Sequence, residues 1–428
     1  MGHISTKNNI LVHVNYLPKQ SQIWLLDIAR VKIRNSTLLL RIIIDTTLFF
    51  CEYENIQIKL SNLIKFRDLY MLKNKFNFGL GIGGWLTNYK RFNVLPTQWR
   101  TPITIGDLEH FESYITQKDI NYIASLGVDH IRLGFDQIVI ESAIGEYREE
   151  TLKHIDNFIK WCEEANVFPI LNLHKAIGNY CDIKEEVTLF DSNELQQRFI
   201  NLWLMLEKRY SAKPNIAFEL LNEVRDIPPA LWNSLLDKTI MALRTLNKER
   251  ILIIGPTNWG SPAFLKHLNV YDDPNIIYTY HFYEPNEFTH QRGVLMANTL
   301  YYNRDMPYPC DDIERYREFY RLVFNRQDAY KEYKSVDKEY LRVMMQPAFD
   351  WVKTHPDKTL WLGEFGTIRH CKLEWRINYM QDVMSLAKEY NIGYCAWNYL
   401  STPNDGNRFS LVDDDTRQLL HPLLINLI

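Results

Sequence analysis

The chain has 428 residues, of which 46% are hydrophobic, 13% aromatic and 24% charged. This composition is ordinary for a folded globular protein and excludes a largely disordered chain. The formal net charge is -3, and lysine and arginine are spread along the chain, so the basic patch of a nucleic-acid or membrane-surface binder is absent from the sequence. We therefore expect a neutral substrate, with no nucleic-acid partner and no membrane partner.

Cysteine spacing and hydropathy predict the compartment. The six cysteines, at positions 51, 162, 181, 310, 371 and 395, show no CxxC spacing and are too sparse for a disulfide framework. The longest apolar run, 38–50, contains Arg41 and Asp45, and it is shorter than the about 20 residues that span a bilayer. It also begins too late for a signal peptide, and no small-residue cleavage site follows it. The sequence thus predicts a cytoplasmic protein with reduced thiols.

Residues 1–70 do not share the pattern of the rest of the chain. They are basic and polar at first, then mixed β-like and apolar without a clear period. We treat 1–70 as an N-terminal extension of unclear role and 71–428 as one domain. A natural start at Met71 is compatible with this division, because MLKNKFNF leads directly into the first strand-like run.

From Phe76 onward, short apolar runs alternate with helical patterns, which is typical of a parallel sheet built from β–α units. The runs are 78–84, 129–135, 167–173, 215–221, 251–255, 275–281, 359–363 and 392–397. Eight parallel strands close a barrel. The predicted fold class is therefore α/β, a (β/α)8 TIM barrel.

Amphipathic stretches between these runs predict the outer helices. They are 116–125, 152–165, 194–210, 231–247, 340–354 and 374–390. The connection after His281 is much longer than the usual few residues, and its part from 311 to 340 is rich in charge and tyrosine. We interpret it as a long insertion after strand 6, a lid with helices of its own.

Two of the predicted strands end in a glutamate. IAFELLNE, 216–223, ends in Asn222 and Glu223, and LWLGE, 360–364, ends in Glu364. Either glutamate alone is explained more simply as the polar end of a strand. In one barrel, however, the carboxyl ends of all strands open on the same face, where barrel enzymes place their chemistry. Two glutamates facing one cleft indicate glycoside cleavage.

Further polar and aromatic residues fall at the predicted strand ends. They are Arg132, His174, Asn222, His281, Tyr283 and Trp397. A lone histidine or tryptophan at such a place is usually a packing residue, but joint placement on one face is harder to assign to packing.

At this point the chain resembles glycoside hydrolase family 5, the cellulase-like branch of the retaining barrel glycosidases, from about Phe76 to the C-terminus. The resemblance rests on motifs at most strand ends, which together are highly specific. They are GIGGWL at 81–86, HIRLGF at 130–135, LNLHKAIGN at 171–179, FELLNE at 218–223, YHFYEP at 280–285, FTHQ at 288–291, GEFG at 363–366 and AWNYL at 396–400.

The resemblance implies that Glu223 is the catalytic acid/base and Glu364 the nucleophile, with the other strand-end residues forming the sugar pocket. Retaining hydrolysis requires the two carboxyl groups to lie about 5 to 5.5 Å apart. Glu364 must stay ionised, and we expect Arg132 to stabilise its charge through paired hydrogen bonds, with one more from Tyr283. Glu223 must hold a proton, so its charge should be less well compensated.

Three further polar residues are expected to support this pair. Asn222 is suited to the sugar 2-hydroxyl, and His174 and His281 would order neighbouring hydroxyls and carboxylates. Glu219 is the rival carboxylate, but four residues before Glu223 it would lie deeper in the barrel and more naturally anchor a buried hydrogen-bond network.

Tryptophans offer flat apolar faces on which a sugar ring can lie. Trp397 is the first choice, with Trp85 and Trp259 as further candidates. The loop position of Trp259 favours binding only slightly, and Trp85 could equally cap the floor of the barrel.

Other signals carry less weight. Gly79, Gly81 and Gly84 satisfy GxGxxG, but no helix follows them, so dinucleotide binding is not expected. HExxH, GxSxG and GxxxxGK[ST] are absent from the sequence, so we expect no metal, no serine triad and no cofactor. Cys395 reads as a small core residue.

The leading hypothesis is a retaining β-glycosidase acting on a β-linked glucan or its oligosaccharides. Within enzymes, a mannan- or β-1,3-glucan-directed hydrolase remains an alternative. A sugar-binding pseudoenzyme without turnover is a third, although the two intact glutamates argue against it. The sequence leaves linkage, exo or endo action and oligomeric state open.

Overall fold

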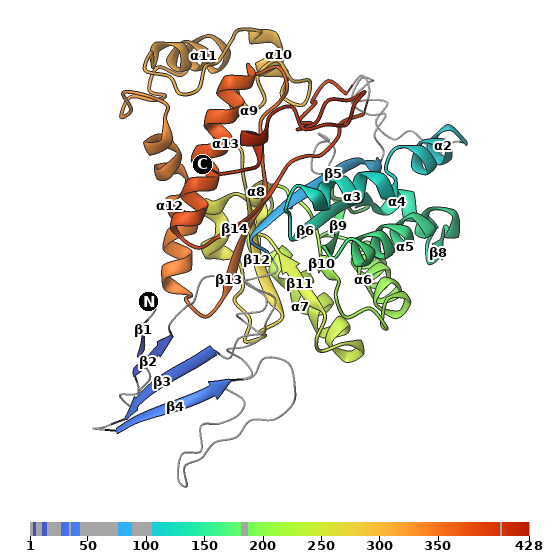
Figure 1. Cartoon of the computed structure of the whole chain (residues 1–428). Coiled ribbons are helices and arrows are strands. Elements are labelled where there is room, and N and C mark those ends of the chain that lie inside the picture. The colour runs from blue at the N-terminus through green and yellow to red at the C-terminus, as the bar shows by residue number, and fades with distance from the viewer. Residues whose placement is uncertain are drawn as a thin grey trace. The chain divides into compact units, whose positions relative to one another are not determined.

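The computed structural model describes residues 3–5, 11–14, 27–33, 36–42, 76–87, 105–180, 187–402 and 405–427 (Figure 1). The chain divides into two compact units, 1–64 and 65–428. The boundary predicted between residues 70 and 71 falls outside the described residues.

The first unit contains an antiparallel sheet in the order β1-β2-β3-β4. Its strands are β1 (His3–Ser5), β2 (Leu11–Val14), β3 (Asp27–Ile33) and β4 (Ser36–Ile42). Strands β3 and β4 pair along their whole length, from Asp27 opposite Ile42 to Ile33 opposite Ser36. They therefore form a β-hairpin, in agreement with the β-like but aperiodic sequence.

The second unit is a closed barrel of parallel strands in the order β10-β11-β12-β13-β14-β5-β6-β9. The strands are β5 (Phe78–Leu86), β6 (His130–Asp136), β9 (Phe168–Lys175), β10 (Ala217–Glu219), β11 (Ile251–Ile254), β12 (Ile276–Phe282), β13 (Thr359–Phe365) and β14 (Gly393–Ala396). All eight predicted strands and the predicted fold class are confirmed.

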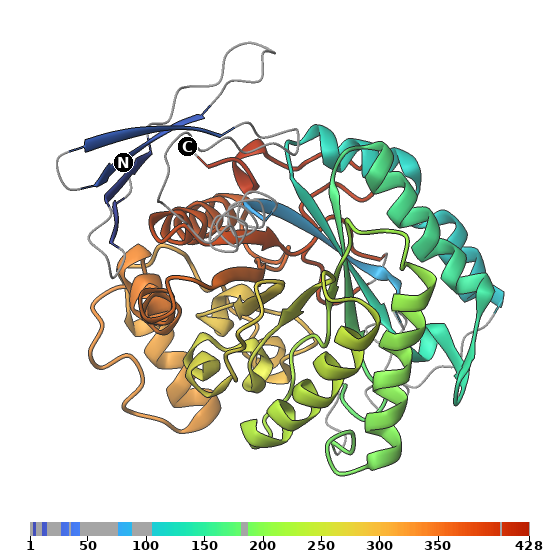
Figure 2. The same cartoon turned by 90° about the horizontal axis from the view of Figure 1, so that it is seen from below.

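Helices form an outer ring around these strands (Figure 2). They include α2 (Ile105–Ser113), α3 (Gln117–Ser125), α5 (Glu149–Glu164), α6 (Asn193–Arg209), α7 (Pro229–Leu246), α12 (Lys338–Thr354) and α13 (Leu373–Glu389). The six predicted helices are confirmed with ends shifted by three residues or fewer. Across the described residues, we find no helix with the length and apolar character needed to cross a membrane.

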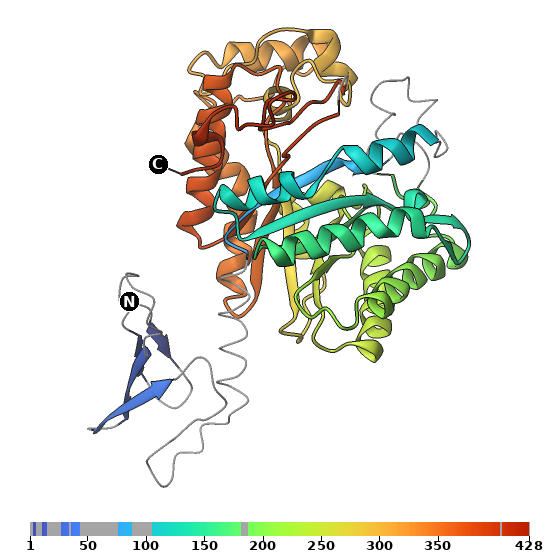
Figure 3. The same cartoon turned by 45° about the vertical axis from the view of Figure 1, so that its right-hand side comes forward.

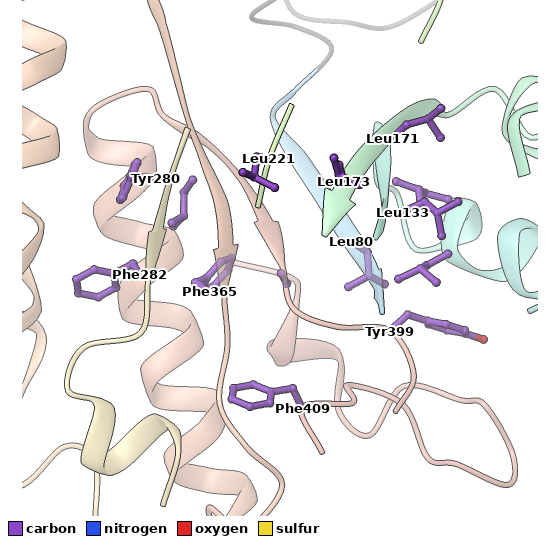
Figure 4. Packing of buried hydrophobic residues seen from close by; sticks show 14 of the residues in the cluster. Leu80, Leu133, Leu171, Leu173, Leu221, Tyr280, Phe282, Phe365, Tyr399 and Phe409 are labelled. Carbon is purple, nitrogen blue, oxygen red and sulfur yellow. The ribbon is translucent and has the colours of Figure 1, made fainter. Parts of the chain in front are cut away.

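The alternation of side chains along each strand determines which side chains point into the barrel. In β6, Ile131 and Leu133 belong to the large apolar cluster between strands and helices, and Figure 4 shows Leu133 beside Leu80 and Leu171 of the flanking strands. Because successive strand side chains point to opposite faces, Arg132 projects into the barrel. A second cluster, which includes Trp361 and Cys395, fills the interior below it; the prediction that Cys395 is a core residue is confirmed.

The connection after β12 forms the predicted insertion, which does carry helices of its own. They are α9 (Asn286–Thr289), α10 (Ala297–Tyr302) and α11 (Glu314–Phe324). Figures 1 and 3 show α10 and α11 together at one end of the barrel. Buried Tyr316 and Phe319 of α11 join the main apolar cluster, so the insertion is packed onto the barrel domain.

Candidate active site

A pocket of about 720 Å³ lies at the carboxyl ends of the barrel strands, within the size range of small-molecule sites. Most of the predicted site residues line it: His174, Glu223, Trp259, His281, Tyr283, Glu364 and Trp397. These side chains come from β9, β12, β13 and the segments that follow β10, β11, β12 and β14. The barrel thus brings together residues as far apart in the sequence as His174 and Trp397.

Glu364 lies near the end of β13 and is held by two hydrogen bonds. Its Oε1 accepts from Arg132 Nη1, and its Oε2 accepts from the hydroxyl of Tyr283 at 2.9 Å. Burial by itself raises the pKa of Glu364, but the charges of His281 and Arg132, together with the two hydrogen bonds, lower it. These neighbours therefore favour the anionic form of Glu364.

Arg132 shares its guanidinium among three acceptors. Its paired hydrogen bonds go to Glu219, from Nε to Oε2 at 2.5 Å and from Nη2 to Oε1 at 2.8 Å, and Nη2 also donates to Asn222 Oδ1 at 2.7 Å. The prediction of a paired bond to Glu364 is thus wrong, because Glu219 lies deeper in the barrel and faces the fork of the guanidinium. The predicted buried network at Glu219 is confirmed.

Glu223 follows β10 in a conformation that few side chains adopt. Its φ is +40°, a left-handed value that costs a residue with a Cβ about 1 to 3 kcal/mol and is found mainly at functional sites. Its side chain is 20% exposed, against 5% for Glu364. Burial and the charge of Glu364 raise the pKa of Glu223 despite an opposing hydrogen bond from His281. Of the two glutamates, Glu223 is therefore the one that takes up a proton more readily.

His281 connects the two glutamates. Its Nδ1 lies 3.0 Å from Glu223 Oε1 and 3.6 Å from Glu364 Oε2. Burial lowers the pKa of His281, but the two carboxylates outweigh burial and raise it. One oxygen of each carboxylate and one nitrogen of His281 all lie within 4.8 Å of one another, close to the about 5 to 5.5 Å between the carboxyl groups of retaining glycosidases.

The same three side chains, Glu223, His281 and Glu364, are the group of described residues that could offer ligands to a metal ion. Both oxygens of Glu364 already accept hydrogen bonds, and one of the donors is the cationic guanidinium of Arg132. A second cation at Glu364 would be repelled by that charge. The arrangement suits proton transfer and nucleophilic attack better than cation binding.

Trp397 and His174 form one wall of the pocket. Their rings are stacked, with centroids 5.3 Å apart and planes 6° apart. Trp397 lies against the glycines of β5, where a Cβ on Gly81 would approach Trp397 Cε3 to 2.7 Å and a Cβ on Gly83 would approach Cζ2 to 2.5 Å. Gly81 and Gly83 therefore make room for this indole, and a Cβ on Gly79 would overlap with His130 Nε2, so side-chain packing accounts for Gly79 and Gly81 of the GxGxxG pattern.

The other two predicted tryptophans differ. Trp259 is 41% exposed and lines the pocket, and its backbone N–H donates to Val224 O at 2.8 Å, next to Glu223. Trp85 is fully buried, donates from Nε1 to Phe111 O at 2.8 Å and does not line the pocket. Its expected contact with sugar is not supported, because the register shift after Ile82 turns Trp85 away from the barrel mouth.

Arg132 and Asn222 also lie outside the lining of the described pocket, since both are buried beneath it, 0% and 1% exposed. Several lining residues were not predicted: Glu284, Asn286, His290, Asn398, Asn407 and Phe409. The motifs YHFYEP and FTHQ contain two of them, Glu284 and His290, but no spacing rule assigned these a role. The loop that carries Asn407 and Phe409 has no recognisable pattern at all.

The barrel, the pocket and the paired glutamates define a class of protein, the barrel glycoside hydrolases. Residues 92–402 match the family Cellulase (glycosyl hydrolase family 5), and the chain belongs to that family.

Known relatives agree with this assignment. Endoglucanase C of Acetivibrio thermocellus is 38% identical over 334 residues, which cover 76% of this chain and 91% of that protein. Cellodextrinase A of Ruminococcus flavefaciens is 32% identical over 218 residues, 50% of this chain and 60% of that protein. A solved hyperthermophilic endo-beta-1,4-glucanase in complex with substrate has the same fold, with a TM-score of 0.63 and 21% identity over 83% of this chain and 97% of that one. The chain is accordingly a glycoside hydrolase.

Proposed function

We propose that this glycoside hydrolase cleaves a β-linked glucan or its oligosaccharides with retention of anomeric configuration. The observation that carries the proposal is the approach of one carboxylate oxygen of Glu223 to one of Glu364, within 4.8 Å, with the pKa values of the two groups shifted in opposite directions. The similarity to endoglucanase C supports a β-glucan as the substrate. A gap this small leaves no room for the water of an inverting mechanism, which needs about 6.5 to 9.5 Å.

In the first step, Glu364 attacks the anomeric carbon and the glycosidic C–O bond breaks. Glu223 gives its proton to the departing oxygen, so the leaving sugar departs as a neutral alcohol. The product of this step is a covalent glycosyl ester of Glu364. Because that ester carries no charge, the repulsion that raised the pKa of Glu223 disappears, and Glu223 is left as a carboxylate ready to act as a base.

In the second step, Glu223 takes a proton from water, and the water oxygen attacks the anomeric carbon from the side vacated by the leaving sugar. The ester bond to Glu364 breaks, and Glu364 returns as a carboxylate that Arg132 and Tyr283 stabilise by hydrogen bonding. Two displacements at one carbon restore the original configuration. The released sugar therefore has the β configuration.

The remaining residues take supporting roles in this proposal. His281, within hydrogen-bond distance of Glu223, orients the acid, while the parallel rings of Trp397 and His174 offer a flat wall to the sugar ring. Asn222, held by Arg132 beneath the pocket, is the proposed partner of the 2-hydroxyl of a sugar bound to Glu364.

The test is to incubate the purified protein with β-1,4-glucan, β-1,3-glucan and mannan oligosaccharides and to follow the first product by proton NMR. We expect β-anomeric product from a β-glucan oligosaccharide. An α product would contradict the mechanism, turnover of mannan alone would contradict the substrate class, and binding without turnover would indicate a sugar-binding protein.

A further inference from the structure

His290 lies in the pocket wall but takes no part in the steps above. It follows α9 in the insertion, is 7% exposed and lines the pocket. Its ring packs against Tyr283 and Phe409, with centroid distances of 5.2 and 5.1 Å. It is thus held rigidly beside the tyrosine that donates to Glu364.

The hydrogen bonds around Thr289 fix the position of the proton on His290. Thr289 Oγ1 lies 2.5 Å from the carbonyl oxygen of Tyr283, 3.4 Å from that of Pro285 and 2.9 Å from His290 Nδ1. A hydroxyl has one proton, and carbonyl oxygens only accept. The proton of Thr289 therefore goes to a carbonyl, and Nδ1 of His290 must be the donor to Thr289 Oγ1.

A neutral imidazole with its proton on Nδ1 has an acceptor at Nε2. Burial lowers the pKa of His290 to about 4, so the ring is neutral at ordinary pH. Among the described residues, Nε2 has no hydrogen-bond partner. It is also absent from the fully buried polar atoms without a partner, so part of its surface is accessible. It therefore reaches the pocket surface as an acceptor.

A second acceptor lies in the same wall. Glu284 also lines the pocket, and its Oε1 accepts a hydrogen bond from Asn286 Nδ2 at 2.9 Å. Together, Glu284 and His290 give this wall groups that accept hydrogen bonds, which matches a ligand rich in hydroxyl donors.

We propose that His290 is a substrate-binding residue whose Nε2 accepts a hydrogen bond from a sugar hydroxyl. The inference rests on the proposed function, since it takes the ligand to be a β-glucan chain. It adds a specificity determinant from the insertion, because a sugar without a hydroxyl at that position would leave Nε2 unpaired.

The test measures binding separately from turnover. In a Glu223→Gln background, whose amide mimics the protonated acid, the Kd of a β-1,4-linked glucose hexasaccharide is measured by calorimetry. His290→Asn can still donate to Thr289 but has no atom at the place of Nε2, and we expect binding to weaken about five- to tenfold, as for one lost neutral hydrogen bond. His290→Gln places an amide oxygen near the position of Nε2, and we expect it to recover at least about half of the lost binding free energy.

His267→Asn, at an exposed histidine outside the pocket lining, is the matched control and should bind like the background protein. If His290→Asn binds within about twofold of the background, the inference about His290 is overturned while the proposed function stands. Equal weakening in the Asn and Gln variants would also overturn it, because that result indicates a packing role for His290. If melting temperatures show that the Asn variant is unfolded, the Gln variant decides, and a loss of about tenfold or more there overturns the inference. A background protein that binds no glucan overturns the proposed function, and the inference with it.

Discussion

Glu223 and Glu364 are both glutamates at the carboxyl ends of barrel strands, yet their surroundings shift their pKa values in opposite directions. Glu364 is 5% exposed and accepts from Arg132 and Tyr283, whereas Glu223 is 20% exposed and contacts only His281 among these groups. The charges of His281 and Arg132 outweigh burial and lower the pKa of Glu364, whereas burial and the charge of Glu364 raise the pKa of Glu223. In the proposed mechanism, the neighbours of the two glutamates, and not the carboxyl groups themselves, make one the acid and the other the nucleophile.

The largest effect should follow removal of the Glu364 carboxylate, which accepts hydrogen bonds from Arg132 and Tyr283. Glu364→Ala removes the attacking atom, so turnover should fall by on the order of 10⁵-fold or more on every substrate. Added azide should restore cleavage of a substrate with a good leaving group and give the α-glycosyl azide, because a small anion then attacks directly. Initial rates and NMR of the azide product measure this. Near-normal activity of Glu364→Ala would show that the two roles are wrongly assigned.

Glu223→Gln should have a smaller effect that depends on the substrate. Loss of a general acid costs about 10²- to 10⁴-fold where the leaving sugar needs protonation. An aryl glycoside, whose leaving group needs little help, should still form the glycosyl ester rapidly and show a burst of phenol. Azide should now give the β-glycosyl azide, since it intercepts the ester of Glu364. An equal loss on glycan and aryl substrates would contradict the acid role of Glu223.

Tyr283→Phe should shift the balance between the glutamates without removing either. The hydroxyl donates to Glu364 Oε2 at 2.9 Å, and a hydrogen bond to a charged group contributes about 1.5 to 3 kcal/mol. Its loss should raise the pKa of Glu364, because the hydrogen bond from Tyr283 favours the charged form. Because Glu364 works ionised, activity is lost as pH falls through its pKa, so the acid limb of kcat/KM against pH should move to higher pH.

The alkaline limb should stay in place in Tyr283→Phe, because activity is lost there as pH rises through the pKa of Glu223, which the tyrosine does not contact by a hydrogen bond. A shift of the alkaline limb alone would contradict this assignment. Tyr280→Phe is the matched control, since Tyr280 precedes His281 on β12, is buried and does not line the pocket.

The sequence was sufficient for the barrel and for the pair of glutamates, because both follow from periodicity and from the rule that parallel strands end on one face. It could not predict the hydrogen-bond partners of Arg132. Whether the paired N–H groups of the guanidinium face Glu219 or Glu364 depends on how deep each side chain lies in the barrel, which the spacing of residues does not encode. Trp85 failed as a site residue for a related reason. Gly84 has a φ of +74°, and the accompanying register shift reverses the direction that simple alternation predicts. His290 stands in the FTHQ motif, but no spacing rule gave it a role, and Phe409 comes from a loop whose course no pattern predicts.

The smallest effect should come from the exposed aromatic on the Glu223 side of the pocket. Trp259→Ala removes an indole that is 41% exposed but keeps the backbone bond to Val224 O, so Glu223 should hold its position. We expect KM for oligosaccharides to rise about fivefold, since stacking contributes about 1 kcal/mol, with little change in kcat. Trp375→Ala on α13, outside the pocket lining, should leave KM unchanged. If Trp259→Ala instead moved the alkaline limb of the pH profile, the indole would contribute to the raised pKa of Glu223 and would not be only a surface for sugar.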